Sequence, residues 1–229
     1  MKRQPDTWVV VPAYNEEKAI GPVLAQLVGY PYGIVVVDDG SADDTAKEAM
    51  AFPVVVLRHA FNLGQGAALQ TGMEYALRFP ETRYVVTFDS DGQHSVDDIE
   101  RLLEPLRAGT HDVVLGSRFL RDGGATDIKT SKRLFLKLAV AFTRLATGLP
   151  LTDTHNGLRA FTAEAAARLH ITQNRMAHAS EIIAQIAASK LRWCEVPVTV
   201  SYTSYSVAKG QGMLNSINIL WDMVRGRMK

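Results

Sequence analysis

The first half of the chain alternates short runs of valine and isoleucine with segments of helical periodicity, and this pattern restricts the fold more than any other feature. The apolar runs lie at residues 8–11, 34–37, 53–57, 84–88 and 113–115, and the helical patterns lie at residues 16–29, from about 43, 69–77 and 96–108. A strand that is apolar at every position is covered on both faces, which is typical of parallel sheets. The pattern therefore predicts an α/β fold, with a doubly wound, Rossmann-like, mostly parallel sheet between two helical layers.

The regular alternation stops near Gly116. We expect a loop at residues 117–130, paired extended segments around Pro197 at residues 194–202, and helices at residues 131–147, 163–169, 179–190 and 212–226. No repeat or linker divides the sequence. We therefore expect a single domain over residues 1–229.

Charge and composition exclude several classes of protein. The 25 Lys and Arg residues nearly balance the 24 Asp and Glu residues, so a nucleic-acid-binding protein is not expected. The single cysteine, Cys194, cannot form an internal disulfide or a multi-cysteine zinc site. The sequence shows neither the apolar run of a signal peptide nor a stretch of the ~20 apolar residues that span a bilayer. We therefore expect a cytoplasmic protein.

The charges are unevenly divided along the chain. Residues 1–117 carry 9 basic and 17 acidic side chains, whereas residues 118–229 carry 16 basic and 7 acidic ones. Opposite charge in the two halves indicates two different kinds of partner.

Two carboxylates follow the fourth predicted strand, where ligands of an open parallel sheet bind. Asp89 and Asp91 are separated by one residue, which puts both carboxylates on the same side of an extended segment. They repel each other unless a cation lies between them, and hard divalent cations prefer oxygen ligands. Gln93 offers a further carbonyl oxygen, and His94 could bind metal or position a phosphate. A polar turn with a helix cap is the alternative, but the polar residues after the neighbouring strands favour a divalent metal ion.

The other strand ends offer ligands for a nucleotide. Asp39 could accept a hydrogen bond from a ribose hydroxyl or a base N–H, or it could only form a turn. Residues 62–66 open a helix, so the backbone N–H groups could face a phosphate or the two glycines could serve tight packing. A Gly-x-Gly-x-x-Gly fingerprint after the first strand and a Walker A loop are both missing from the sequence, which argues against dinucleotide oxidoreductases and P-loop hydrolases.

Six segments in register resemble family 2 glycosyltransferases of the GT-A fold, and in particular the polyprenyl-phosphate sugar transferases similar to dolichol-phosphate mannose synthase. The segments are residues 11–16, 37–41, 62–66, 89–94, 116–118 and 153–159. The resemblance extends over about residues 8–209. It implies a nucleotide-sugar-binding half at residues 1–117 and an acceptor-side half with the C-terminal helices at residues 118–229.

The resemblance implies inverting transfer of a sugar from a UDP-, GDP- or dTDP-linked donor. The implied nucleotide-sugar ligands are Pro12, Ala13, Tyr14, Asn15, Glu16, Asp39, Asn62, Gly66, Asp89 and Ser90. The implied ligands of Mg²⁺ or Mn²⁺ are Asp89, Asp91 and Gln93. Breaking a glycosyl–phosphate bond builds negative charge on the departing diphosphate. A bound divalent cation stabilises that charge.

The nature of the acceptor decides whether the enzyme needs a base. The implied acceptor-phosphate ligands are Arg118, Arg159 and Lys209, and the catalytic candidates are Asp91, Asp153, Glu181 and Arg118. A polyprenyl phosphate is itself the nucleophile, whereas a hydroxyl acceptor requires a carboxylate such as Asp153 or Glu181 to take its proton. The sequence departs from the family pattern at Thr203, where an arginine is expected, and at Gln65, where many relatives have lysine.

Two alternatives follow from these departures. The acceptor could be a hydroxyl of a cell-surface polysaccharide, or the chain could be a catalytically silent nucleotide-sugar-binding subunit. A sugar nucleotidyltransferase is disfavoured, since no glycine-rich segment follows the first strand.

Basic residues in the second half accompany two apolar helical patterns. Residues 118–144 hold seven basic and two acidic side chains, and the helix predicted at 212–226 contains Trp221 and is followed by basic residues. Such helices suit contact with an anionic membrane, although they could equally pack on the core or form a homodimer. We therefore expect peripheral contact with the cytoplasmic face of the membrane.

Overall fold

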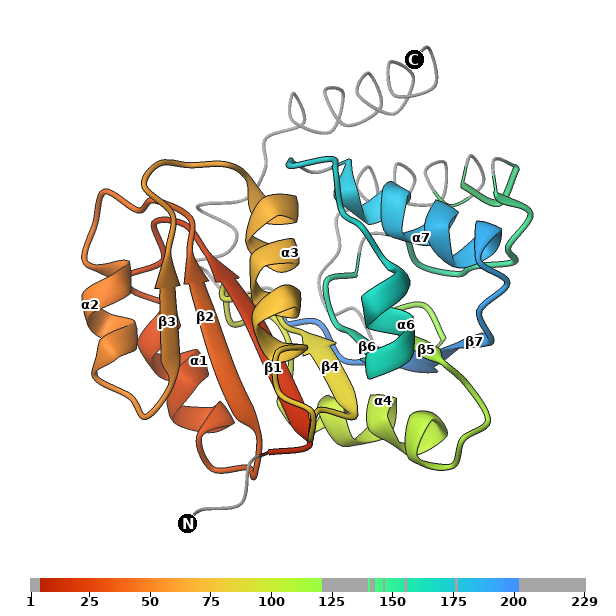
Figure 1. Cartoon of the computed structure of the whole chain (residues 1–229), viewed down its shortest axis with the longest axis horizontal. Helices are drawn as coiled ribbons and strands as arrows, with labels where there is room; N and C mark the ends of the chain where they lie inside the picture. Colours follow the sequence, from red (N-terminus) through yellow and green to blue (C-terminus); the bar gives the residue numbers. More distant parts are fainter. Residues whose placement is uncertain are drawn as a thin grey trace.

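A seven-stranded sheet lies between helices in the computed structural model, which describes residues 5–120, 140, 143–145, 147–154, 156–175 and 177–201 (Figure 1). The strands are β1 (Thr7–Ala13), β2 (Gly33–Asp38), β3 (Val55–Arg58), β4 (Tyr84–Thr87), β5 (Val113–Ser117), β6 (Arg159–Thr162) and β7 (Trp193–Pro197). Their order is β3-β2-β1-β4-β6-β5-β7. Within these described residues, all strand pairs are parallel except the two that β6 makes with β4 and β5. The predicted α/β fold with a mostly parallel sheet is confirmed.

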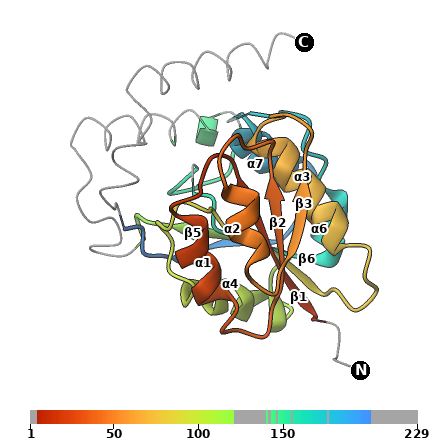
Figure 2. The same cartoon turned by 90° about the vertical axis from the view of Figure 1, so that its left-hand side faces the viewer.

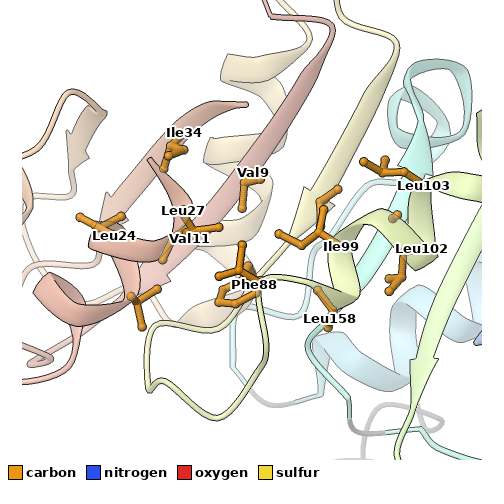
Figure 3. Close-up of a cluster of buried hydrophobic side chains, with 14 of the residues drawn as sticks. Val9, Val11, Leu24, Leu27, Ile34, Phe88, Ile99, Leu102, Leu103 and Leu158 are labelled. Carbon is orange, nitrogen blue, oxygen red and sulfur yellow. The ribbon is translucent and has the colours of Figure 1, made fainter. Parts of the chain in front are cut away.

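The valine runs supply both faces of the sheet. Val9 and Val11 pack in one core with α1 (Ile20–Leu27), α2 (Thr45–Met50) and α4 (Asp98–Arg107) (Figure 3). Val10 packs in a second core with α3 (Gln65–Ala76), α6 (Ala163–Arg168) and α7 (His178–Ala188). Figure 2 shows α1, α2 and α4 across the sheet from α3 and α6. Side chains on consecutive strand positions therefore point into two different cores, which explains why every position is apolar.

The antiparallel strand β6 was not predicted. Its four residues contain one arginine and one threonine, so the sequence shows neither an apolar run nor a strict alternation there. It lies between β4 and β5 in the sheet. Because β6 runs against the other strands, it begins at the edge where they end. Arg159, its first residue, is therefore level with Thr87 at the end of β4.

Several predicted boundaries and contacts differ from the structure. β7 pairs with β5, and Val200 forms an isolated bridge with His94, so the described residues 194–201 do not pair with each other. The helices α2 and α4 begin at Thr45 and Asp98, about two residues later than predicted, and Asp44 and Asp97 occupy their N-cap positions. The hydroxyl of Ser41 accepts a hydrogen bond from the Asn15 N–H.

Most of the remaining predictions for the second half lie outside the described residues. These are the greater part of the loop at 117–130 and of the helix at 131–147, Thr203, Lys209, and the C-terminal helix at 212–226 with its possible homodimer contact. In the part of the chain that is described, no helix combines the length and apolar character needed to cross a bilayer.

Two helical glycines allow a matched test of the packing. A Cβ on Gly72 of α3 would lie 2.3 Å from Cγ1 of Val10, whereas a Cβ on Gly21 of α1 would meet only Phe52 at 4.0 Å. Gly72→Ala should lower the free energy of unfolding by about 1–3 kcal/mol through overpacking. Gly21→Ala should raise it by up to about 1 kcal/mol, because alanine favours helix. Urea unfolding measures both, and a stabilising Gly72→Ala would contradict the close approach of α3 to β1.

Candidate active site

The carboxyl ends of β1, β2 and β4 meet where the strand order reverses. β2 and β3 lie on one side of β1, and β4 lies on the other. Ligands of doubly wound sheets bind in the crevice at such a point. The segments that follow these strands therefore form a candidate active site.

The segment after β1 interlocks with the segment after β2. Asn15 has a positive φ of 53°, and its N–H donates to the Ser41 hydroxyl at 2.9 Å. The side-chain Oδ1 of Asn15 accepts from the Ala42 N–H at 2.9 Å, and the Glu16 N–H donates to Thr45 Oγ1 at 2.7 Å. Pro12 and Ala13 are buried in β1, while the Tyr14 side chain is exposed. The predicted nucleotide-binding segment is thus held in a fixed conformation.

Asp39 organises the loop that leads into α3. Its buried carboxylate accepts hydrogen bonds from the Leu63 N–H at 2.9 Å and from the Gly64 N–H at 2.7 Å. Its Oδ1 also lies 2.7 Å from Nδ1 of His59. Three contacts leave little acceptor capacity of the carboxylate for a ligand. The structure shows a loop-holding role for Asp39, and its contact with a nucleoside stays a prediction.

The two glycines of the 62–66 segment serve tight packing. A Cβ on Gly64 would lie 2.2 Å from the carbonyl oxygen of Asn174, and a Cβ on Gly66 would lie 2.2 Å from that of Gln173. The Gly66 N–H donates to the Asn174 oxygen at 2.8 Å. The sequence left open whether Gly66 faces a phosphate or serves tight packing. Its N–H group is bonded to Asn174, so the structure favours packing. Asn62 is exposed at the start of this loop.

Neighbours from two other segments and from its own loop surround the Asp89 carboxylate. Gln65 Nε2 donates to Oδ1 at 3.0 Å, and His94 Nε2 lies 3.4 Å from Oδ2. A Cβ on Gly157 would lie 2.0 Å from Oδ2, so a larger residue there would displace the carboxylate. Burial disfavours the charged form, but the hydrogen bond from His94 and the charges of His94 and Arg159 outweigh it and keep the pKa of Asp89 below its usual range.

Asp91 has the opposite electrostatic character. Its Oδ1 accepts a hydrogen bond from the Gln93 N–H at 3.1 Å. Burial, together with the negative charge of Asp89, raises the pKa of Asp91 to about 6. Ser90, between the two carboxylates, is buried. Two neighbouring carboxylates with this mutual repulsion are suited to a divalent cation.

The protein offers only part of a metal coordination sphere. Within the described residues, no three His, Cys, Asp or Glu side chains are grouped so that they could hold a metal ion. The backbone carbonyl of Gln93 accepts from the Ser201 N–H, which leaves the side-chain oxygen for the predicted ligand role. Mg²⁺ is commonly held by one or two carboxylates and completed by phosphate oxygens and water. The Asp89 and Asp91 pair fits that kind of site.

Both predicted base candidates are engaged in bonds to the protein. Asp153 forms a buried ion pair with Arg118, whose Nε lies 2.6 Å from Oδ2. The Glu181 carboxylate accepts from the N–H groups of Thr172 and Gln173 and from the Thr172 hydroxyl. Each carboxylate thus holds a neighbouring segment of the protein, and a role of either one as a base stays a prediction.

Glu195 supports this arrangement and was not predicted. Its carboxylate accepts from the N–H groups of Thr152 and Asp153, and so fixes the loop that carries Asp153. The residues are more than forty positions apart in the chain, and the sequence carries no signal of this pairing.

Arg159 differs from Arg118 because its guanidinium makes no hydrogen bond within the described part of the chain. The residue is only 3% exposed. Burial lowers the pKa of Arg159 to about 10, although the charges of Asp89 and Asp153 oppose this shift. The side chain stays cationic at neutral pH and keeps its donors for an anion.

Because the Asp89 and Asp91 carboxylates repel each other, we predict that neutralising Asp91 stabilises the protein. The pKa of about 6 exceeds the value of about 4 in an unfolded chain, so ionised Asp91 costs stability as the pH rises through that interval. In the presence of EDTA, Asp91→Asn should raise the free energy of unfolding at pH 7.5 by on the order of 1 kcal/mol. The gain should shrink at pH 5. The exposed Glu81→Gln is the control, and a gain that does not change with pH would contradict this electrostatic account.

Comparison with known proteins agrees with this geometry. A sequence model of the family described as "Glycosyl transferase family 2" matches residues 8–169. The UDP-N-acetylglucosamine–dolichyl-phosphate N-acetylglucosaminyltransferase of Methanococcus voltae is 31% identical over 96% of this chain and 96% of its own length. The polyprenol monophosphomannose synthase of Mycolicibacterium smegmatis is 30% identical over 72% of this chain and 65% of its own length.

A solved structure supports the fold. The glucosyl-3-phosphoglycerate synthase of Mycobacterium tuberculosis, in complex with Mn²⁺, UDP and phosphoglyceric acid, superimposes with a TM-score of 0.73. The match covers 96% of this chain and 76% of that one at 18% identity, so it establishes the GT-A fold alone. Membership of a family is established by sequence, through the family model and the Methanococcus relative. The chain belongs to glycosyltransferase family 2.

Proposed function

We propose that the enzyme transfers a sugar, with inversion, from a nucleotide-diphosphate donor to the phosphate of a polyprenyl phosphate at a membrane surface, in a metal-dependent reaction. The observation that carries this proposal is that Asp153 and Glu181 are both engaged with the protein, while the Arg159 guanidinium keeps its donors. A phosphate acceptor needs no base but benefits from a cation. The names of the Methanococcus and Mycolicibacterium relatives agree with a lipid-phosphate acceptor.

On the donor side, residues 1–117 would form the nucleotide-sugar half. Asp91, with Asp89 and Gln93, would hold Mg²⁺ or Mn²⁺ on the donor diphosphate, as the Mn²⁺ and UDP in the structurally similar synthase suggest. The bound cation would stabilise the charge that develops on the departing diphosphate. The rigid Pro12–Glu16 segment would contact the nucleoside, and its Tyr14 side chain is exposed at the surface.

On the acceptor side, residues 118–229 would receive the lipid phosphate. A phosphate oxygen attacks the anomeric carbon, and the bond from that carbon to the diphosphate oxygen breaks on the opposite face. The electron pair leaves with the diphosphate, and no proton has to be removed. Arg159 would attract the acceptor phosphate, and the Asp153 carboxylate would hold Arg118 beside it.

A polyprenyl phosphate acceptor also determines where the enzyme would work. A polyprenyl phosphate resides in the bilayer, so the enzyme would work as a peripheral protein on the cytoplasmic face, with the basic side chains of residues 118–144 near anionic headgroups. UDP-, GDP- and dTDP-linked sugars all fit the proposed donor class.

Removal of Asp91 should abolish most of the activity. We expect Asp91→Ala to lower turnover with Mn²⁺ or Mg²⁺ by about 100-fold or more, because a Lewis acid contributes several kcal/mol to such reactions. The assay follows release of nucleoside diphosphate from the donor in the presence of polyprenyl phosphate. Turnover of Asp91→Ala at the wild-type rate would rule out the metal assignment.

Glu181→Gln separates the two acceptor classes. With a phosphate nucleophile, kcat should fall no more than a few-fold at a temperature where the variant is folded, although stability should drop because Glu181 holds residues 172–173. Glu164→Gln, in the first turn of α6, is the matched control. Loss of all activity in Glu181→Gln alone would favour a polysaccharide hydroxyl acceptor.

If the wild-type protein binds a nucleotide diphosphate but turns over no acceptor, that result would favour a catalytically silent nucleotide-sugar-binding subunit.

A further inference from the structure

A buried histidine at the start of α7 is not used by the mechanism above. The Nδ1 atom of His178 lies 2.7 Å from the carbonyl oxygen of Arg175, and the residue is 5% exposed. A carbonyl oxygen can only accept, so Nδ1 must carry the hydrogen. In the neutral ring, Nε2 is therefore a bare hydrogen-bond acceptor. Within the described part of the chain, no donor reaches Nε2.

The ring lies beside the site. A Cβ on Gly66 would come within 3.0 Å of Cβ of His178, which places the histidine at the first turn of α3. The neighbouring residue of that turn, Gln65, holds the Asp89 carboxylate. The N-terminal ends of α3 and α7 thus bring His178 to the same region as Asp89.

The charge state of the ring follows from its surroundings. Burial, followed by the positive charge of Arg159, lowers the pKa of His178 to about 4. The bond to Arg175 and the negative charges of Asp89 and Glu181 act in the opposite direction but are weaker. The ring is therefore neutral at physiological pH.

Because Nε2 of His178 is an uncharged hydrogen-bond acceptor, it can bind only some kinds of group. Its lone pair repels the oxygens of a phosphate. The cation proposed above is assigned to the carboxylates of Asp89 and Asp91, which leaves His178 for another part of the donor. The ribose hydroxyls belong to the nucleoside, which is assigned above to the Pro12–Glu16 segment. The hydroxyls and the amide N–H of the sugar are therefore the remaining neutral donors close to the diphosphate.

We propose that Nε2 of His178 accepts a hydrogen bond from a hydroxyl or amide N–H of the donor sugar and so distinguishes the nucleotide sugar from the free nucleoside diphosphate. This inference rests on the proposed donor class. It adds a sugar-binding residue outside the six segments that carry the family resemblance.

Two substitutions of His178 distinguish the role of Nδ1 from the role of Nε2. In H178N the side-chain NH₂ can replace Nδ1–H and donate to the Arg175 carbonyl, but no atom reaches the position of Nε2. In H178Q the amide oxygen reaches that position, whereas the bond to Arg175 is lost. Titration calorimetry with Mn²⁺ would compare UDP with UDP-glucose and UDP-N-acetylglucosamine, and GDP with GDP-mannose.

We expect H178N to bind the nucleoside diphosphate within twofold of wild type and the matching nucleotide sugar about fivefold to tenfold more weakly. H178Q should retain most of the preference for the nucleotide sugar. Equal weakening of both ligands in H178N, or no change in either, would overturn the inference. Failure of the wild type to bind any of these ligands would instead contradict the proposed function, and the inference with it.

A measurement on the wild type covers the case in which H178N does not fold. The ¹⁵N resonance of His178 Nε2 should shift upfield on addition of the nucleotide sugar, as an acceptor nitrogen does when it gains a hydrogen bond, and should shift less with the nucleoside diphosphate. Equal shifts with both ligands would overturn the inference.

Discussion

The position of the Asp89 carboxylate is the constraint on which the rest of the site depends. Asp89 follows a parallel strand of the first half, and Gly157 precedes the antiparallel strand of the second half. The two residues approach so closely that a methyl group on Gly157 would overlap the carboxylate. Gln65 and His94 hold the same carboxylate from the start of α3 and from the loop after β4. The first and second halves of the chain therefore meet at one anion.

The reversed direction of β6 makes this meeting possible. A parallel strand at that place would begin at the far edge of the sheet and would bring its first residues away from the site. Because β6 is antiparallel, Gly157 and Arg159 reach the edge where β4 ends. The buried guanidinium of Arg159 then lies close enough to Asp89 and Asp153 for their charges to act on it. Asp89 comes from the acidic first half of the sequence, and Arg159 comes from the basic second half. The two opposite charges therefore lie close together at this edge of the sheet.

The parallel strands and the segments at their ends could be predicted, because continuous valine runs and polar strand ends are local signals. β6 could not, since its residues Arg-Ala-Phe-Thr have no strand-like pattern of their own and depend on neighbours on both sides. The partners of Asp39, Asp153 and Glu181 were also hidden. Their carboxylates accept hydrogen bonds largely from backbone N–H groups, which nearly every residue carries, and the sequence does not reveal such bonds. The sequence therefore indicates only a possible base at Glu181, and the structure adds that Glu181 holds residues 172–173.

The central claim is that the acceptor is a phosphate and not a hydroxyl, and a pair of lipids that differ only in that group tests it most directly. Purified enzyme with Mn²⁺ and a radiolabelled nucleotide sugar would be incubated with vesicles that contain either a polyprenyl phosphate or the corresponding polyprenol. The account predicts labelled lipid from the polyprenyl phosphate and none from the polyprenol. Label on the polyprenol at a comparable rate would contradict it, because a hydroxyl acceptor requires a base, whereas the account has Asp153 and Glu181 engaged in bonds to the protein.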